Sequence, residues 1–165
     1  MTEIRTLQPN DDDAYRALWL FGITEQPAYF RVAPSDESPH GIPTHFRPDS
    51  FTLGVFSGSD LVGVVSIERD TRAKLRHKAL VFRMFIHPRA ASQGIGRALL
   101  EHAIYLAQDL SGLKYLYLTV LASNTRAIHL YTALNFHEFA REHGGVLIGD
   151  QYIDELQMSY QLVGT

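Results

Sequence analysis

Three observations predict that residues 1–165 form a single mixed α/β domain. Short apolar runs rich in β-branched and aromatic residues recur along the 165-residue chain, as they do in strands. Apolar stripes at helical spacing lie between some of these runs. Glycine, proline and asparagine separate the segments, where turns are expected. The length fits one domain with one hydrophobic core, and we find no internal repeat or low-complexity segment.

The first elements follow from local signals near the N-terminus. Residues 4–7 alternate apolar and polar side chains and predict a strand. Three aspartates at residues 11–13 predict the start of a helix, because acidic side chains stabilise its positive end, and helical spacing continues to about residue 25. Residues 27–49 hold five prolines, so we expect an irregular segment with at most short helical turns. Long irregular segments are often functional, which makes this one a candidate lid over a binding site.

The remaining elements are expected where apolar periodicity is bounded by glycine or proline. A turn containing Gly58 predicts a hairpin in the first half of the chain, and Gly144-Gly145 marks the expected turn between the last two strands. Strands are expected at residues 51–56, 61–67, 81–86, 113–121, 136–141 and 151–162, and helices at residues 95–110 and 125–134.

Composition excludes several classes of function. The net charge is −3 with an isoelectric point near 6.2, and no basic stretch suits a phosphate backbone, so no nucleic-acid partner is expected. The absence of cysteine excludes disulfides, thiolate metal sites and a cysteine nucleophile. The eight histidines lack the helical pairing of metalloprotease sites, so we expect no metal. Without a signal-peptide core or a membrane-length apolar run, we expect a cytoplasmic protein with no membrane partner.

The junction after residues 81–86 carries the clearest functional signal. A strand runs through small residues, with glycine at Gly94 and Gly96, into a helix. Unpaired N–H groups at a helix start bind anions, so a diphosphate would dock there with Arg97 as a nearby cation. The dinucleotide fingerprint fails at Leu99, and the lysine of a P-loop is absent. The alternative is a tight turn that needs glycine only for packing.

This junction resembles the pyrophosphate loop of the GCN5-related N-acetyltransferase (GNAT) superfamily, Arg/Gln-x-x-Gly-x-Gly/Ala. Gly94 and Gly96 take the two glycine places, and the Arg/Gln place falls on Ala91. A second register starts at Gln93 and ends at Ala98, but it leaves Gly94 unexplained. In the preferred register, backbone N–H groups supply most of the grip on phosphate.

The resemblance continues downstream in the same order as in the family. The segment from Asn124 through Tyr131 to Phe136 is similar to the family pattern N-x-x-A-x-x-L-Y-x-x-x-G-F, with Asn135 in place of the glycine. Asparagine tolerates a left-handed helix cap, so the geometry can survive. Residues 152–158 are similar to the last strand of the family. The resemblance therefore covers nearly the whole chain and implies a central mixed, mostly antiparallel sheet of six to seven strands flanked by about four helices.

Family membership would imply an acetyl-CoA-dependent N-acetyltransferase that uses no metal. Its acceptor would be a primary amine of a small molecule or peptide, attacking the thioester directly in a ternary complex. Tyr131 matches the family's general acid, and Asn124 precedes it by two helical turns. The implied cofactor-binding residues are Asn124, the strand backbone of Met84, Phe85 and Ile86, and the loop Ser92, Gln93, Gly94, Ile95, Gly96 and Arg97.

Several points stay open at the level of sequence. Some relatives carry a glutamate base where this chain has Thr119, so the base is one of Glu68, His87, Asp154 and Glu155, or water. A basic cluster at residues 69–78 is either a solvated hairpin or a contact for the 3′-phosphate of coenzyme A. The rival function is a catalytically degenerate acyl-CoA-binding or sensing module, and a third is a structural interaction domain. The acceptor, the acyl chain and a homodimer are likewise left open.

Overall fold

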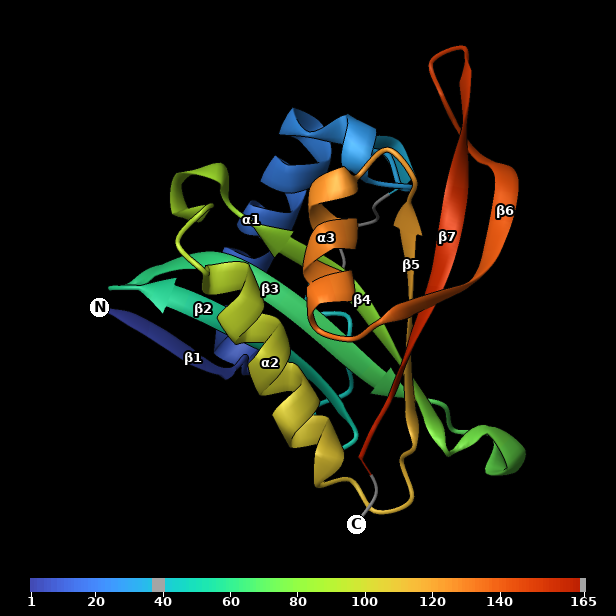
Figure 1. The fold of residues 1–165 in the computed structure, drawn as a ribbon. Coiled ribbons are helices and arrows are strands. Elements are labelled where there is room, and N and C mark those ends of the chain that lie inside the picture. Colours follow the sequence, from blue (N-terminus) through green and yellow to red (C-terminus); the bar gives the residue numbers. More distant parts are fainter. Residues whose placement is uncertain (37–40, 164–165) are drawn as a thin grey trace.

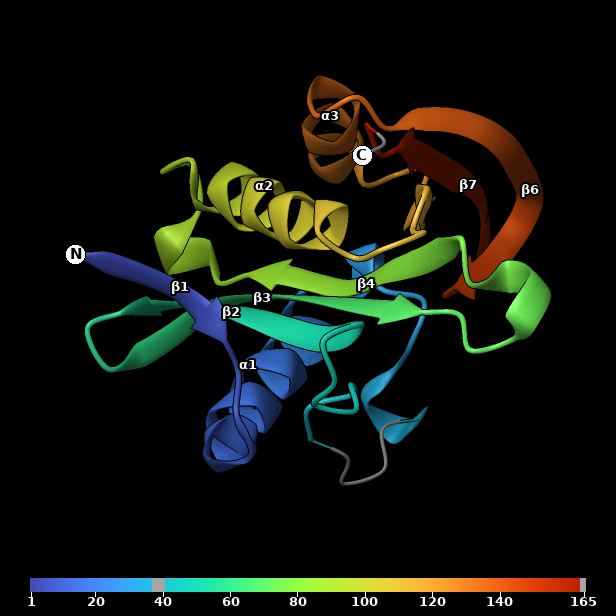
Figure 2. The same cartoon turned by 90° about the horizontal axis from the view of Figure 1, so that it is seen from below.

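The computed structural model describes residues 1–36 and 41–163, which form one twisted seven-stranded sheet with helices on both faces (Figures 1 and 2). The strand order is β1-β2-β3-β4-β5-β7-β6, and every neighbouring pair is antiparallel except β4 and β5. The strands are β1 (Thr2–Thr6), β2 (Ser50–Ser57), β3 (Asp60–Arg69), β4 (Lys78–Ile86), β5 (Tyr115–Leu121), β6 (His137–Ile148) and β7 (Gln151–Gln161). The α-helices are α1 (Asp12–Glu25), α2 (Ile95–Gln108) and α3 (Thr125–Ala133).

The predicted mixed, mostly antiparallel architecture is confirmed. The described residues form seven strands and three α-helices, one α-helix fewer than the four that the resemblance implied. In its described residues, the proline-rich segment forms one-turn 3-10 helices at Pro27–Tyr29 and Pro34–Asp36 and no longer helix. Residues 37–40 of that segment lie outside the described part of the chain. In the described residues no helix is both long enough and apolar enough to cross a bilayer.

The turn predicted at Gly144-Gly145 is wrong, because β6 continues past it to Ile148. The pairing register shifts between Glu142 and Val146, so the two glycines lie in a bulge within the strand. Asp154 holds the bulge by accepting hydrogen bonds from the Gly144 N–H at 2.9 Å and pairing with His143 at 3.1 Å. The true turn is Gly149-Asp150, where Gly149 has φ of 65° and Ile148 pairs with Gln151.

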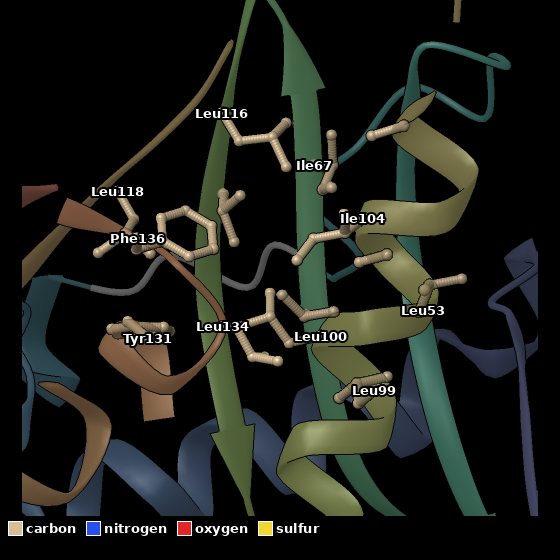
Figure 3. Packing of buried hydrophobic residues seen from close by; sticks show 14 of the residues in the cluster. Leu53, Ile67, Leu99, Leu100, Ile104, Leu116, Leu118, Tyr131, Leu134 and Phe136 are labelled. Carbon is tan, nitrogen blue, oxygen red and sulfur yellow. The ribbon is translucent and has the colours of Figure 1, made fainter. Parts of the chain in front are cut away.

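Two hydrophobic cores lie on opposite faces of the sheet. The apolar stripe of α2 covers the larger core, in which Leu99 and Leu100 are fully buried against β2 and β3 (Figure 3). Helix α3 lies on the same face and adds Tyr131 to this core (Figures 2 and 3). Helix α1 covers the other face, where Tyr15 and Ile23 are fully buried in a smaller core with Phe85 of β4. The sheet therefore has a face covered by α2 and α3, and an α1 face.

Strands β4 and β5 pair over only three residues and then separate. Their parallel ladder runs from Lys78 with Tyr115 to Leu80 with Tyr117 and ends there. Figure 1 shows the two strands diverging from this shared end, with α3 in front of the gap. Beyond Leu80, the β4 edge that faces β5 has no strand partner among the described residues. Backbone N–H and C=O groups are therefore left available inside the sheet.

A β-bulge interrupts β4 on its other side, where it pairs with β3. Val64 pairs with Phe85 and Ser66 with Phe82, so two residues of β4, Arg83 and Met84, oppose one of β3. Arg83 has φ of 51°, in the left-handed region that a non-glycine residue adopts only at some cost. Its guanidinium lies 5.0 Å from the ring centroid of Trp19 in α1. Bulges often re-aim side chains beside active sites, and this one turns Arg83 toward the α1 face.

Candidate active site

The loop before α2 presents its backbone donors to solvent. Ser92 and Gly94 have φ of 64° and 75°, and Gly94 is the N-cap residue of α2. The first four N–H groups of a helix have no intrahelical partner, and the first turn of α2 carries no acidic side chain. A Cβ added to Gly96 would lie 3.5 Å from both Ile86 and Leu130, so the helix start packs closely on β4 and α3. The loop therefore has the backbone arrangement that an anion site needs, and its role in binding stays a prediction.

The loop side chains contact protein groups rather than point at the helix start. Gln93 donates to the Arg89 carbonyl at 3.3 Å, and Arg97 pairs with Glu101 one helical turn away at 2.8 Å. The Ser92 hydroxyl accepts a hydrogen bond from Arg126 of α3 at 3.1 Å. Sequence reasoning missed Arg126. Its position in the sequence could have identified it, because Arg126 comes two residues after Asn124 and so falls in the first turn of the helix that Asn124 caps.

Asn124 fixes the start of α3. Its side-chain oxygen accepts a hydrogen bond from the Ala127 N–H at 3.2 Å, as an N-cap residue does. The cap holds the helix that carries Tyr131 across the opening between β4 and β5 (Figure 1). At the other end Asn135 has φ of 69° and leads the chain into Phe136, which is fully buried. Asparagine therefore serves where the family pattern has glycine.

Tyr131 meets the bulge of β4 directly. Its hydroxyl donates a hydrogen bond to the Met84 sulfur at 3.8 Å, and the side chain is 8% exposed. Burial raises the pKa of Tyr131 to about 12, because the phenolate would lose its hydration. The phenol therefore keeps its proton at neutral pH. The structure brings Tyr131 and Met84 together, two of the residues that the sequence singled out.

The separated strands suit an extended ligand that carries amide groups. Along β4 the N–H and C=O groups of alternate residues point to alternate edges, so some of those in residues 82–86 point toward the gap. A chain laid in the gap would bond to these groups as an added strand does. Phosphates at the start of α2 would lie at the outer end of such a ligand, and Tyr131 with Met84 at the inner end. These residues fit the pantetheine and diphosphate of coenzyme A.

On the α1 face of the sheet, the middle of β5 has one uncovered side chain. Thr119 is exposed although it lies in the middle of β5, an interior strand of the sheet. Val120 and Leu156 pair with each other and belong to the larger core, so the alternation of strands turns Thr119, Leu121 and Glu155 to the α1 face. Thr119 is therefore reached by solvent on the side of the sheet opposite to α2 and α3.

Glu155 is a buried carboxylate on the α1 face. It is 3% exposed and forms an ion pair with Arg31 of the proline-rich segment at 3.3 Å. Burial raises the pKa of Glu155, Glu142 directly across on β6 adds to the rise, and Arg31 opposes it. A carboxylate with a raised pKa is a stronger base than a solvated one. Nothing in the sequence pattern indicates that Arg31 or Glu142 lies beside Glu155.

The other predicted bases are placed less favourably. Asp154 is committed to the β6 bulge, and its bond to the Gly144 N–H lowers its pKa further than any other contact does. His87 stacks on Phe21, and its Nδ1 accepts a hydrogen bond from the Arg89 N–H at 3.1 Å. The neutral ring then carries its proton on Nε2, so neither nitrogen is free to take one. Burial lowers the pKa of His87, which keeps the ring neutral.

Glu68 lines a separate cavity of about 620 Å³ on the α1 face, at the closed end of the β4–β5 pair. Its carboxylate pairs with His45 at 3.0 Å. Phe82 and Leu80 of β4 and Tyr117 of β5 also line this cavity. The basic cluster forms the β3–β4 connection around a 3-10 turn at Ala73–Leu75, at the opposite end of β4 from the loop before α2. Across residues 1–36 and 41–163, no three His, Asp or Glu side chains form a metal-binding group.

Comparisons with known proteins agree on one family. The family model described as "Acetyltransferase (GNAT) family" matches residues 13–136. A [ribosomal protein bS18]-alanine N-acetyltransferase of Escherichia coli K12 is 44% identical over 61 residues, which span 37% of this chain and only 40% of that protein.

Solved structures reproduce nearly the whole fold. A GNAT-family acetyltransferase of Streptococcus pneumoniae has a TM-score of 0.82 at 26% identity, covering 99% of this chain and 100% of that one. The yncA protein of Salmonella typhimurium, solved with its cofactor acetyl-CoA, has a TM-score of 0.81 at 18% identity, covering 100% and 96%. At that lower identity the likeness shows the fold alone.

Proposed function

The chain belongs to the acetyltransferase (GNAT) family, and we propose that it transfers an acetyl group from acetyl-CoA to a primary amine of a small molecule or peptide. The observation that carries the proposal is the contact of the buried Tyr131 hydroxyl with Met84, at the bulge of β4 and beside the gap that separates β4 from β5. A buried hydroxyl beside unpaired strand edges suits an acid that acts on an extended bound ligand.

The cofactor-binding residues divide the ligand between them. Backbone N–H groups of the loop Ser92 to Arg97 would bind the diphosphate, and the unpaired edge of Met84, Phe85 and Ile86 would bond to the pantetheine amides. A backbone N–H of the same stretch would polarise the thioester carbonyl. Asn124 would hold α3 against the pantetheine through its cap.

When bound, acetyl-CoA supplies a thioester whose carbonyl carbon takes the amine and whose sulfur leaves as a thiolate. Tyr131 donates a proton to the departing sulfur, because its pKa of about 12 keeps the phenol protonated until then. The Met84 sulfur holds the hydroxyl beside the strand before reaction. Direct attack of the amine in a ternary complex is the mechanism that the family resemblance implies, and the chain has no cysteine that could carry the acetyl group.

We assign the general base to Glu155. A lysine-like amine is neutral in only roughly one molecule in 10³ at pH 7, so a base speeds the reaction. Glu155 combines burial, a raised pKa and a position on the α1 face. The Arg31 ion pair favours the carboxylate form that a base needs, and the amine would lose its proton to Glu155 directly or through one water.

The acceptor amine enters from the α1 face in this scheme. The partial match to an enzyme that acts on the alanine of a ribosomal protein favours a peptide N-terminus. The alternative, a sensing module that binds acyl-CoA without turnover, draws on Ala91 and Thr119, which depart from the family pattern.

Thiol release separates the enzyme from the sensor. We would incubate the protein with acetyl-CoA and a panel of amino acids, polyamines and alanine-terminated peptides, and measure free coenzyme A. Release that depends on one class of amine is expected. Tight cofactor binding with no release on any amine would favour the sensor, and no binding at all would reject both.

A further inference from the structure

Two helix N-termini meet at the loop before α2. Ser92 lies just before α2, and its hydroxyl accepts the 3.1 Å hydrogen bond from Arg126 in the first turn of α3. The first turns of both helices lack acidic side chains, whereas α1 has Asp12 and Asp13 there. The positive ends of two helix dipoles therefore lie beside the same loop, and neither is neutralised by an acidic side chain in its own first turn.

Arg126 adds a full positive charge to that place. The neighbouring arginines are neutralised locally, Arg89 by Asp60 at 3.1 Å and Arg97 by Glu101 at 2.8 Å. Within residues 1–36 and 41–163, the polar contact of the Arg126 side chain is the Ser92 hydroxyl. A cation in the first turn of a helix is unfavourable, because it lies at the positive end of the dipole. Such a placement is explained if an anion binds between Arg126 and the loop.

We propose that Arg126 binds the diphosphate of coenzyme A and replaces the side chain that the family loop carries at the place of Ala91. The inference rests on the proposed function, because it assigns a partner to one group of that ligand. Ala91 is half-buried in extended backbone after the 3-10 turn at Pro88–Ala90 and offers no polar group. Arg126 approaches the same loop from α3, and its planar guanidinium can bond to two phosphate oxygens at once.

Titration calorimetry with coenzyme A and with 3′-dephospho-coenzyme A tests this assignment. Arg126→Ala should raise the Kd for both ligands about tenfold, as expected for loss of a charge-assisted contact at an exposed site. Arg126→Lys should raise it about threefold, because the charge stays and the fork is lost. The double variant Arg126→Ala with Ala91→Arg should recover affinity to within about threefold of the original chain. The loss caused by Arg126→Ala should shrink at high salt.

Arg89→Ala is the matched control, since it removes the same charge near the loop but from a neutralised pair. Its Kd should change by less than about twofold. The unfolding midpoint of unliganded Arg126→Ala should stay within about 2 °C of the original or rise slightly, because the helix start loses an unfavourable charge.

The outcomes separate this inference from the function on which it rests. If the original chain binds neither ligand, the proposed function fails. If it binds both and Arg126→Ala binds them equally well, the assignment of Arg126 fails alone. A loss seen with coenzyme A but absent with the dephospho form would transfer Arg126 to the 3′-phosphate and overturn the diphosphate claim.

Discussion

Burial raises the pKa of both Tyr131 and Glu155, with opposite chemical consequences. A phenol with a raised pKa keeps its proton and can serve as an acid. A carboxyl with a raised pKa holds a transferred proton more firmly and serves as a better base. The two residues lie toward opposite faces of the sheet, so the proposed acid and the proposed base would act from opposite sides of it.

Tyr131→Phe should lower turnover about 10²- to 10⁴-fold, because it removes the proton donor and leaves the ring packing intact. The affinity for acetyl-CoA should stay nearly the same, as measured by calorimetry beside steady-state kinetics. Tyr105→Phe is the matched control, since Tyr105 is 62% exposed on α2. Unchanged turnover in Tyr131→Phe would remove the residue from the mechanism.

The acid limb of the kcat/KM pH profile should follow the surroundings of Glu155. Glu142→Gln removes a charge that raises the pKa of Glu155, so the limb should move to lower pH. Arg31→Ala removes a charge that lowers this pKa, so the limb should move to higher pH. Glu155→Gln should abolish the limb and cut turnover about 10²-fold or more. A limb that ignores all three changes would point to the amine or to water instead.

At the residue scale the sequence carries more information about the predicted cofactor side of the site than about the acceptor side. Gly94, Gly96, Asn124 and Tyr131 carry a local pattern, since each depends on a helix start or on helical spacing. Glu155 was one of four candidates, and its advantage comes from Arg31 and Glu142, which tertiary pairing alone brings to it. Charges that are far apart in the sequence but close in the fold cannot be combined into a pKa shift from the sequence alone.

Element by element, helices followed the sequence more closely than strands did. Helix α1 runs to Glu25 and α2 starts at Ile95, as expected from their apolar spacing. The β4 bulge was not foreseen, because Arg83 adopts φ of 51° through pairing with β3 rather than through local preference. Gly144 misled for a related reason, since a glycine suits a bulge as well as a turn.

Helix α3 depends on its first residue for stability. Asn124→Ala removes the N-cap bond to Ala127 and should destabilise the fold by about 1 kcal/mol in denaturant unfolding. Asn124→Ser keeps a capping oxygen and should lose much less. Equal loss in both variants would mean that the amide matters for something other than the cap.

At the scale of the whole molecule, an ion pair near the N-terminus ties the first strand to the start of the first helix. Arg5 forms a two-pronged ion pair with Asp11, with both N–O distances 2.8 Å, and Asp11 also accepts from the Gln8 N–H at 2.7 Å. Asp11 is 8% exposed, so the pair is shielded on one side. This tie directs α1 onto its face of the sheet, where the smaller core forms.

Asp11→Asn should reduce the free energy of unfolding by about 1–3 kcal/mol at pH 7. The bond to Arg5 lowers the pKa of Asp11, so its stabilising contribution is complete above the unfolded pKa of roughly 3.9. The contribution is lost as the pH falls through the lower folded value. Urea unfolding at a series of pH values should therefore show the two chains converging in acid. Asp13→Asn, an exposed neighbour, should change little, and a gap that persists below pH 2 would contradict the ionic origin.

Because the β4–β5 ladder ends early, the sheet consists of two half-sheets. One contains β1, β2, β3 and β4, and the other contains β5, β7 and β6; three residue pairs form the seam between them. Each half-sheet keeps its own hydrogen-bond ladder on its side of that seam. Hydrogen exchange should therefore be faster at the gap-facing amides of residues 82–86 than in β2 or β3. A ligand bound between β4 and β5 would contact both half-sheets. Coenzyme A should therefore slow amide exchange on both sides of the seam together.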